Sequence, residues 1–282
     1  MKKSIKTIGA MTLALVMAAT TVPVQNVKAA TDVGSYELSD TGVNGRYDIT
    51  GDGVADTVKF EKTENNDGSY YCALDVRING NVALNVKNVD YDYIEPVLIQ
   101  TKEHAYIFIT TYHGNDYLTL SKVYEYVDGK LKQRLDLDSV VGKIFYQYSP
   151  NVYDVKDEYI ELSFAGQSNM LAKTSLRYRF QIGSTGTLSV ANKITSVSYS
   201  NKRENAGKIY TSKYLVASKK LQAYCSSTGT QKAFTITKGT KLKISHVAIS
   251  GKTPRFYCTT SSGKKGWVVS KQNLFKDLSY AG

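Results

Sequence analysis

The chain has 282 residues, long enough for a leader and two ordinary domains, and its 22 tyrosines and 4 prolines favour strands over helices. Its net charge of +11 is unevenly spread: residues 31–200 hold 16 Lys+Arg and 23 Asp+Glu, whereas residues 201–282 hold 16 Lys+Arg and 2 Asp+Glu. After the first thirty residues no apolar run reaches the ~20 residues of a membrane-spanning helix, which argues against a membrane span.

Residues 1–30 are typical of a signal peptide. Three lysines lie among the first six residues, and the short apolar stretch Met11–Ala19 follows them. Val27-Lys28-Ala29 is a small-x-small cleavage pattern, which predicts a cut after Ala29 or Ala30. The alternative is an uncleaved anchor, but the apolar stretch is short for that role. We therefore expect a secreted, extracellular protein.

Residues 31–200 alternate between apolar and polar side chains over many short runs. Asn79-Gly80 and Asp128-Gly129 are hairpin-turn dipeptides, and Gly183 to Gly186 predicts another turn. This pattern predicts one acidic, antiparallel all-β domain, either a sandwich or a short propeller-like fold. The change in charge balance places its boundary near residue 200, with a basic domain over residues 206–282.

The run from Asp48 to Asp56 spaces oxygen-bearing side chains at alternate positions around two glycines. Such spacing can wrap a chain around a hard cation. The candidate metal ligands are Asp48, Thr50, Asp52, the carbonyl of Val54, and Asp56. The loop resembles the Asp-rich calcium loop of integrin-type FG-GAP repeats, which implies a bound structural calcium. The alternative is a polar turn in which the aspartates accept hydrogen bonds from backbone amides.

Two Lys-Gly turns, each beside an alternating strand pattern, organise the C-terminal part. They lie in Thr237–Ile244 and in Gly263–Val268, and a closing Leu274-Phe275 follows. These segments resemble bacterial SH3-type (SH3b) domains, except that Ala223-Tyr224 departs from the family's usual opening strand. The resemblance implies a small SH3-like β-barrel that binds a bacterial cell-wall polymer or peptidoglycan.

The basic charge of residues 201–282 agrees with that implication, since a cell wall is rich in carboxylates and phosphates. Aromatic side chains could add flat surfaces for a sugar or a peptide stem. The candidate ligand-binding residues are Tyr224, Lys238, Lys241, Lys243, Phe256, Tyr257, Lys264 and Lys265. Trp267, the single tryptophan, is expected in the core rather than at a ligand. Export argues against nucleic acid as a partner.

No sequence motif of a common enzyme class is present. The chain lacks Gly-x-Ser-x-Gly, His-Glu-x-x-His and Gly-rich phosphate loops, and Cys72 lies in a strand pattern. His113 is expected in a turn. We therefore expect a non-enzymatic, exported protein with no catalytic residues, whose β-domain is displayed or binds. The alternatives are an adhesion module for another surface protein, and a hydrolase with an unrecognised site in residues 31–200.

Cys225 and Cys258 both lie in the C-terminal part. In an exported protein they could form a disulfide, and the alternative is a pair of free thiols in a small core.

Overall fold

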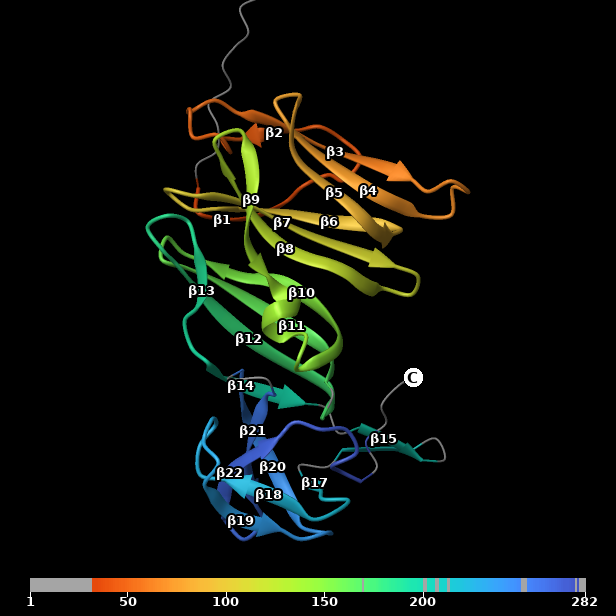
Figure 1. The fold of residues 1–282 in the computed structure, drawn as a ribbon, viewed down its shortest axis with the longest axis vertical. Helices are drawn as coiled ribbons and strands as arrows, with labels where there is room; N and C mark the ends of the chain where they lie inside the picture. The colour runs from red at the N-terminus through yellow and green to blue at the C-terminus, as the bar shows by residue number, and fades with distance from the viewer. Residues whose placement is uncertain are drawn as a thin grey trace, which may run out of the picture.

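The computed structural model describes residues 32–168, 170–199, 202–205, 208–211, 214–249, 253–276 and 278. The expected signal peptide over residues 1–30 lies outside these residues. The described chain is almost entirely antiparallel strand, with one short helix, α1 (Leu137–Val141), so the all-β prediction is confirmed (Figure 1). Across these same ranges, no helix has the length and apolar character that crossing a membrane requires.

The first two sheets form a sandwich. One has the order β2 (Asn44–Tyr47), β3 (Asp56–Glu64), β4 (Tyr71–Ile78), β5 (Asn81–Tyr91). The other has the order β1 (Gly34–Glu37), β6 (Tyr93–Gln100), β7 (Ala105–His113), β8 (Tyr117–Val127), β9 (Lys130–Asp136). Leu74 and Val76 of β4 pack with Ile107 and Ile109 of β7 in one fully buried cluster, which joins the two layers. This packing is a sandwich, one of the two folds predicted for residues 31–200, but it covers only the strands from β1 to β9.

The two-residue turns form as the sequence predicts. Asn79 and Gly80 have φ values of 49° and 78°, and Asp128 and Gly129 have 53° and 80°. Positive φ at both central residues is the type I′ geometry that matches the twist of a hairpin. These turns connect β4 to β5 and β8 to β9.

A long third sheet runs through the rest of the chain. Its order is β10 (Phe145–Val155), β11 (Tyr159–Ser168), β12 (Ala172–Ile182), β14 (Ile194–Tyr199), β20 (Lys241–Ala248), β21 (Arg255–Thr260), β22 (Lys265–Val269), β18 (Leu221–Tyr224), β19 (Lys232–Ile236). The short strands β13 (Leu188–Val190) and β17 (Leu215–Val216) pair with β12 and β20. β15 (Lys202–Asn205) and β16 (Lys208–Thr211) form a separate hairpin.

Strand β14 carries this sheet across the boundary expected near residue 200. Val197 is the partner of Leu176 on β12, while Ile194 is the partner of Ala248 on β20. Within the described part of the chain, the C-terminal strands form an open path that continues into β12, rather than the closed barrel expected from the sequence.

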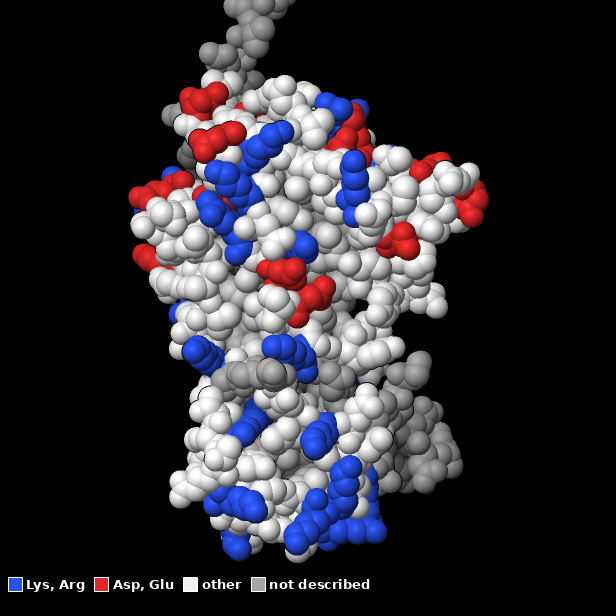
Figure 2. Space-filling model, in the orientation of Figure 1, with Lys and Arg blue, Asp and Glu red and all other residues white. Residues whose placement is uncertain are grey.

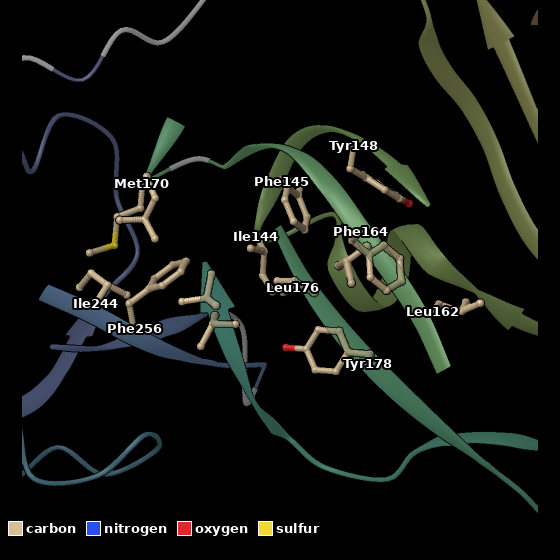
Figure 3. Close-up of a cluster of buried hydrophobic side chains, with 14 of the residues drawn as sticks. Ile144, Phe145, Tyr148, Leu162, Phe164, Met170, Leu176, Tyr178, Ile244 and Phe256 are labelled. Carbon is tan, nitrogen blue, oxygen red and sulfur yellow. The ribbon is translucent and has the colours of Figure 1, made fainter. Parts of the chain in front are cut away.

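One apolar core extends over most of the molecule. It includes Phe108 of the five-stranded sheet, Phe164 and Tyr178 of β11 and β12, and Phe256 of β21. Figure 3 shows Ile244 and Phe256 of the C-terminal strands beside Met170, and Leu176 and Tyr178 beyond them. The C-terminal strands therefore share their core with the strands before them.

A buried charged cluster fixes the sandwich to the turn after β12. Glu125 is 4% exposed, and its Oε1 lies 2.6 Å from Nδ1 of His104. Its Oε2 accepts a hydrogen bond from Nε of Arg134 at 2.6 Å. The turn at Gly186 packs directly on this carboxylate, and the Tyr106 hydroxyl donates to the Gly186 carbonyl at 3.1 Å.

Candidate functional site

The aspartate loop is a tightly hydrogen-bonded turn. Asp48 is buried, and its Oδ1 accepts hydrogen bonds from the backbone N–H of Gly51 at 2.6 Å and of Asp52 at 3.1 Å. Its Oδ2 accepts from the N–H of Gly53 at 2.7 Å. The two glycines have φ of 82°, so they bend the chain around the Asp48 carboxylate.

The other two carboxylates of the loop are also directed at amides. Asp56 is 2% exposed and accepts from the N–H of Ile49 at 2.6 Å and of Thr50 at 2.7 Å. It also accepts from Nδ2 of Asn79 at 2.6 Å. Exposed Asp52 accepts from the N–H of Val54 at 2.8 Å.

This geometry is the polar turn that was the alternative to a metal loop. Among the described residues, no three acidic, histidine or cysteine side chains are grouped to hold a metal ion. Calcium binding by Asp48, Thr50, Asp52, Val54 and Asp56 stays a prediction, because a carboxylate that accepts from amides still has lone pairs that can face an ion.

Replacing Asp56 with alanine is expected to lower the free energy of unfolding by about 2–3 kcal/mol, because several backbone and amide N–H groups lose one buried acceptor. Asp52→Ala is the control: its side chain is exposed and accepts one local bond, so the loss should stay below about 1 kcal/mol. Urea unfolding measures both. Equal losses would contradict the assigned role of Asp56.

Melting curves in calcium and in chelator test whether the loop binds calcium, since a ligand of the native state raises the Tm.

Three aromatic side chains of the C-terminal strands lie on one face of the sheet. Trp267 of β22 is the Cα partner of Tyr257 on β21 and of Tyr224 on β18, and directly paired residues point to the same side. The ring centroids of Tyr257 and Trp267 are 5.1 Å apart. The guanidinium of Arg255 lies 4.5 Å from the centroid of the Tyr224 ring.

The alternation of β21 places the neighbouring residues on the opposite face. Phe256 is fully buried in the core, so it offers no surface to a ligand, and its prediction as a ligand-binding residue is wrong. Tyr224 and Tyr257 are half-buried and remain candidates. Trp267 is 8% exposed, so its predicted burial is confirmed, although it packs with the tyrosines rather than with the main core.

The five candidate lysines are all exposed. Lys243 of β20 and Lys265 of β22 are both Cα partners of Thr259 on β21, so they form one row on the aromatic face. Lys241 lies two residues before Lys243 and points to the same side of β20. Lys238 lies in the turn before β20. Lys264 points away from Lys265, and its Nζ lies 6.0 Å from the centroid of the Phe234 ring.

The electrostatics of this region are one-sided. Within 214–249, 253–276 and 278 the chain has ten lysines, one arginine and no acidic residue. In these ranges no lysine forms an ion pair, whereas lysines of the sandwich, such as Lys62 with Asp40 at 2.6 Å, do so. In Figure 2, Lys and Arg lie on both parts of the visible face, whereas Asp and Glu lie only on its upper part and not at the lower, C-terminal end. We name the exposed lysines Lys238, Lys241, Lys243, Lys264 and Lys265 the lysine rim.

The cysteines do not pair. Cys72, Cys225 and Cys258 are free, so the suggested Cys225–Cys258 disulfide is wrong. Cys258 points into the core from β21, and burial raises the pKa of its thiol to about 11. Cys225 is exposed in the loop after β18. Both thiols are therefore free, as in the alternative, but only Cys258 lies in the core.

Sequence reasoning did not single out a cavity between the β7–β8 turn and the segment from α1 to β10. Its most exposed lining residues are Tyr117 and Tyr146, and Asp138 and Gln147 supply polar groups. These side chains come from separate elements, so no spacing in the sequence links them. The only feature of the sequence that could have indicated this cavity is that Tyr117 and Tyr146 each lie in a polar run. His113, expected in a turn, is instead the last residue of strand β7, immediately before the turn.

No protein-family model, curated protein or solved structure matches the chain.

Proposed function

We propose that this chain is an exported, non-enzymatic protein that binds an anionic polymer of the bacterial cell wall through its C-terminal strands. The observation that carries this proposal is the lysine rim: exposed cationic side chains in a region whose described residues include no carboxylate side chain. Unpaired surface cations attract a polyanion over a distance set by the ionic strength.

The contact between one lysine and one phosphate or carboxylate at a surface is weak, with a free energy of about 0–1 kcal/mol. Useful affinity therefore needs several lysines that act on one polymer. The register of β20, β21 and β22 supports this, because it places Lys241, Lys243 and Lys265 on one face. Tyr224 and Tyr257 on the same face supply flat, half-buried rings for the sugar or peptide portions of the polymer.

In this proposal the acidic sandwich is displayed from the wall. The wall-bound end is basic and the sandwich carries most of the carboxylates, so the two ends differ in their attraction to the polymer. A protein bound at its C-terminal end keeps the sandwich free for a second partner.

The test reverses two lysines of the rim. In the full chain, Lys243→Glu with Lys265→Glu is expected to weaken sedimentation with purified cell walls by about tenfold or more, since two attractions become repulsions. Lys87→Glu with Lys173→Glu is the matched control, because both lysines are exposed outside the C-terminal strands and the net charge changes equally. Equal weakening by the two pairs would mean that net charge alone acts, and no weakening by either would overturn the proposal.

A further inference from the structure

A cavity lies outside the C-terminal strands that carry the lysine rim. The cavity has a volume of about 330 Å³ and is formed where the start of β8 meets α1 and the start of β10. It is at the small end of the ~300–1,000 Å³ that ligand pockets occupy. Its lining consists of Tyr117, Leu118, Asp138, Gly142, Phe145, Tyr146, Gln147 and Tyr148.

Two tyrosines of this cavity are exposed to an unusual extent. Tyr146 is 65% exposed and Tyr117 is 50% exposed. Neither belongs to an apolar core cluster or packs against one, so the fold does not depend on their rings. In contrast, Phe145 and Tyr148 are 2% and 5% exposed and give the cavity a rigid wall. Exposed rings beside a concave surface are available to stack on a ligand.

The polar groups of the cavity are held in place by hydrogen bonds. The Tyr148 hydroxyl donates to Oδ1 of Asp138 at 2.5 Å, which fixes the carboxylate. Burial and the nearby carboxylate raise the pKa of Tyr148, so this hydroxyl stays protonated and keeps donating. Nε2 of Gln147 donates to the carbonyl of Asp116 at 3.1 Å, which leaves Oε1 of Gln147 as an acceptor.

The lining favours a neutral ligand that donates hydrogen bonds. Its only acidic side chain is that of Asp138, and it contains no lysine or arginine, so phosphates and acidic sugars lack a counter-charge. The acceptors are a carboxylate and an amide oxygen, which suit hydroxyl donors. The rings of Tyr117 and Tyr146 suit a flat C–H surface. A sugar ring combines a C–H face with hydroxyl groups on its edge.

We propose that this cavity binds a neutral saccharide, with a sugar ring stacked on Tyr117 or Tyr146 and its hydroxyl groups donating to Asp138 and Gln147. The site is separate from the lysine rim, so it gives the protein a second ligand of different chemistry. This inference does not depend on the proposed wall attachment.

The test is a calorimetric titration of the full chain with two tetrasaccharides, one of β1,4-linked glucose and one of β1,4-linked N-acetylglucosamine. We expect at least one to bind, and Tyr146→Ala or Tyr117→Ala to weaken that binding by about tenfold or more, as loss of a stacking ring does. Asp138→Asn keeps the shape of the site but removes the charge of the acceptor, so it should also weaken saccharide binding. Melting curves confirm that each variant is folded.

Tyr153→Ala is the matched control. Tyr153 is 52% exposed, but it lies further along β10, outside the cavity lining, with its ring 3.3 Å from the guanidinium carbon of Arg177. Equal weakening by Tyr153→Ala would overturn the proposal, as would failure of both saccharides to bind. Choline is the comparison ligand, because aromatic rings beside a carboxylate also attract organic cations. Tighter binding of choline than of either saccharide would overturn the proposal in favour of a cation site.

Discussion

Replacing Gly186 with alanine is expected to lower the free energy of unfolding by about 3 kcal/mol or more. A Cβ atom at this position would lie 2.1 Å from Oε1 of Glu125, and the backbone φ of +72° also disfavours any side chain. The carboxylate has little room to move aside, because His104 and Arg134 hold its two oxygens and it is almost fully buried. The substitution must displace either the turn or the ion pair.

Gly129→Ala is the control for this effect. Its φ is +80° and no atom lies within 4 Å of the added Cβ, so it carries the backbone strain without the collision. That strain alone costs about 1–2 kcal/mol. Urea unfolding of both variants gives the difference. Equal losses would show that Glu125 does not fix the turn after β12 to the sandwich.

The second large effect is expected at Phe256. Phe256→Ala removes a fully buried ring from the shared core and should cost about 3–5 kcal/mol. Phe234→Ala is the control, since Phe234 lies at the edge strand β19 and only partly packs against the same core. Its loss should be clearly smaller.

The shape of the transition adds a further check on the shared core. Because the C-terminal strands share their core and their sheet with β10 to β14, we expect Phe256→Ala to move one cooperative transition that includes the tyrosines of β10 to β12. Unfolding of the C-terminal strands alone, with the rest of the chain unchanged, would contradict a continuous core.

Local features were the ones that the sequence predicted well. The Asn79-Gly80 and Asp128-Gly129 turns form because positive φ is encoded in the dipeptide itself. The all-β class follows from alternation, and the burial of Trp267 follows from its size and its position after a tight turn. Each of these needs only the residues next to it.

Non-local pairing was the part that the sequence did not give. β14 pairs with both β12 and β20, and the polar run around it signals a boundary rather than a bridge. The error at Phe256 has a related cause: Phe256 and Tyr257 are adjacent aromatics, and only the register of β21 decides which one faces the core. The aspartate spacing was ambiguous for a physical reason, since the same carboxylates can satisfy backbone amides or an ion.

The continuous sheet also determines how binding must be measured. A fragment of residues 206–282 would lack β14 and leave the edge of β20 unpaired along His246–Ala248. Exposed strand edges promote association between chains, so binding by such a fragment is a poor guide to the protein. The full chain is the correct material.

The most direct measurement is binding of the full chain to purified bacterial cell walls as salt is raised from ~0.1 M to ~1 M, over which the screening length falls from about 10 Å to about 3 Å. If the lysine rim binds an anionic polymer, the affinity falls steeply with salt, and the variant with Lys243→Glu and Lys265→Glu shows weaker binding and a shallower dependence. Affinity that is unchanged across this range, or an equal dependence in that variant, would contradict the account.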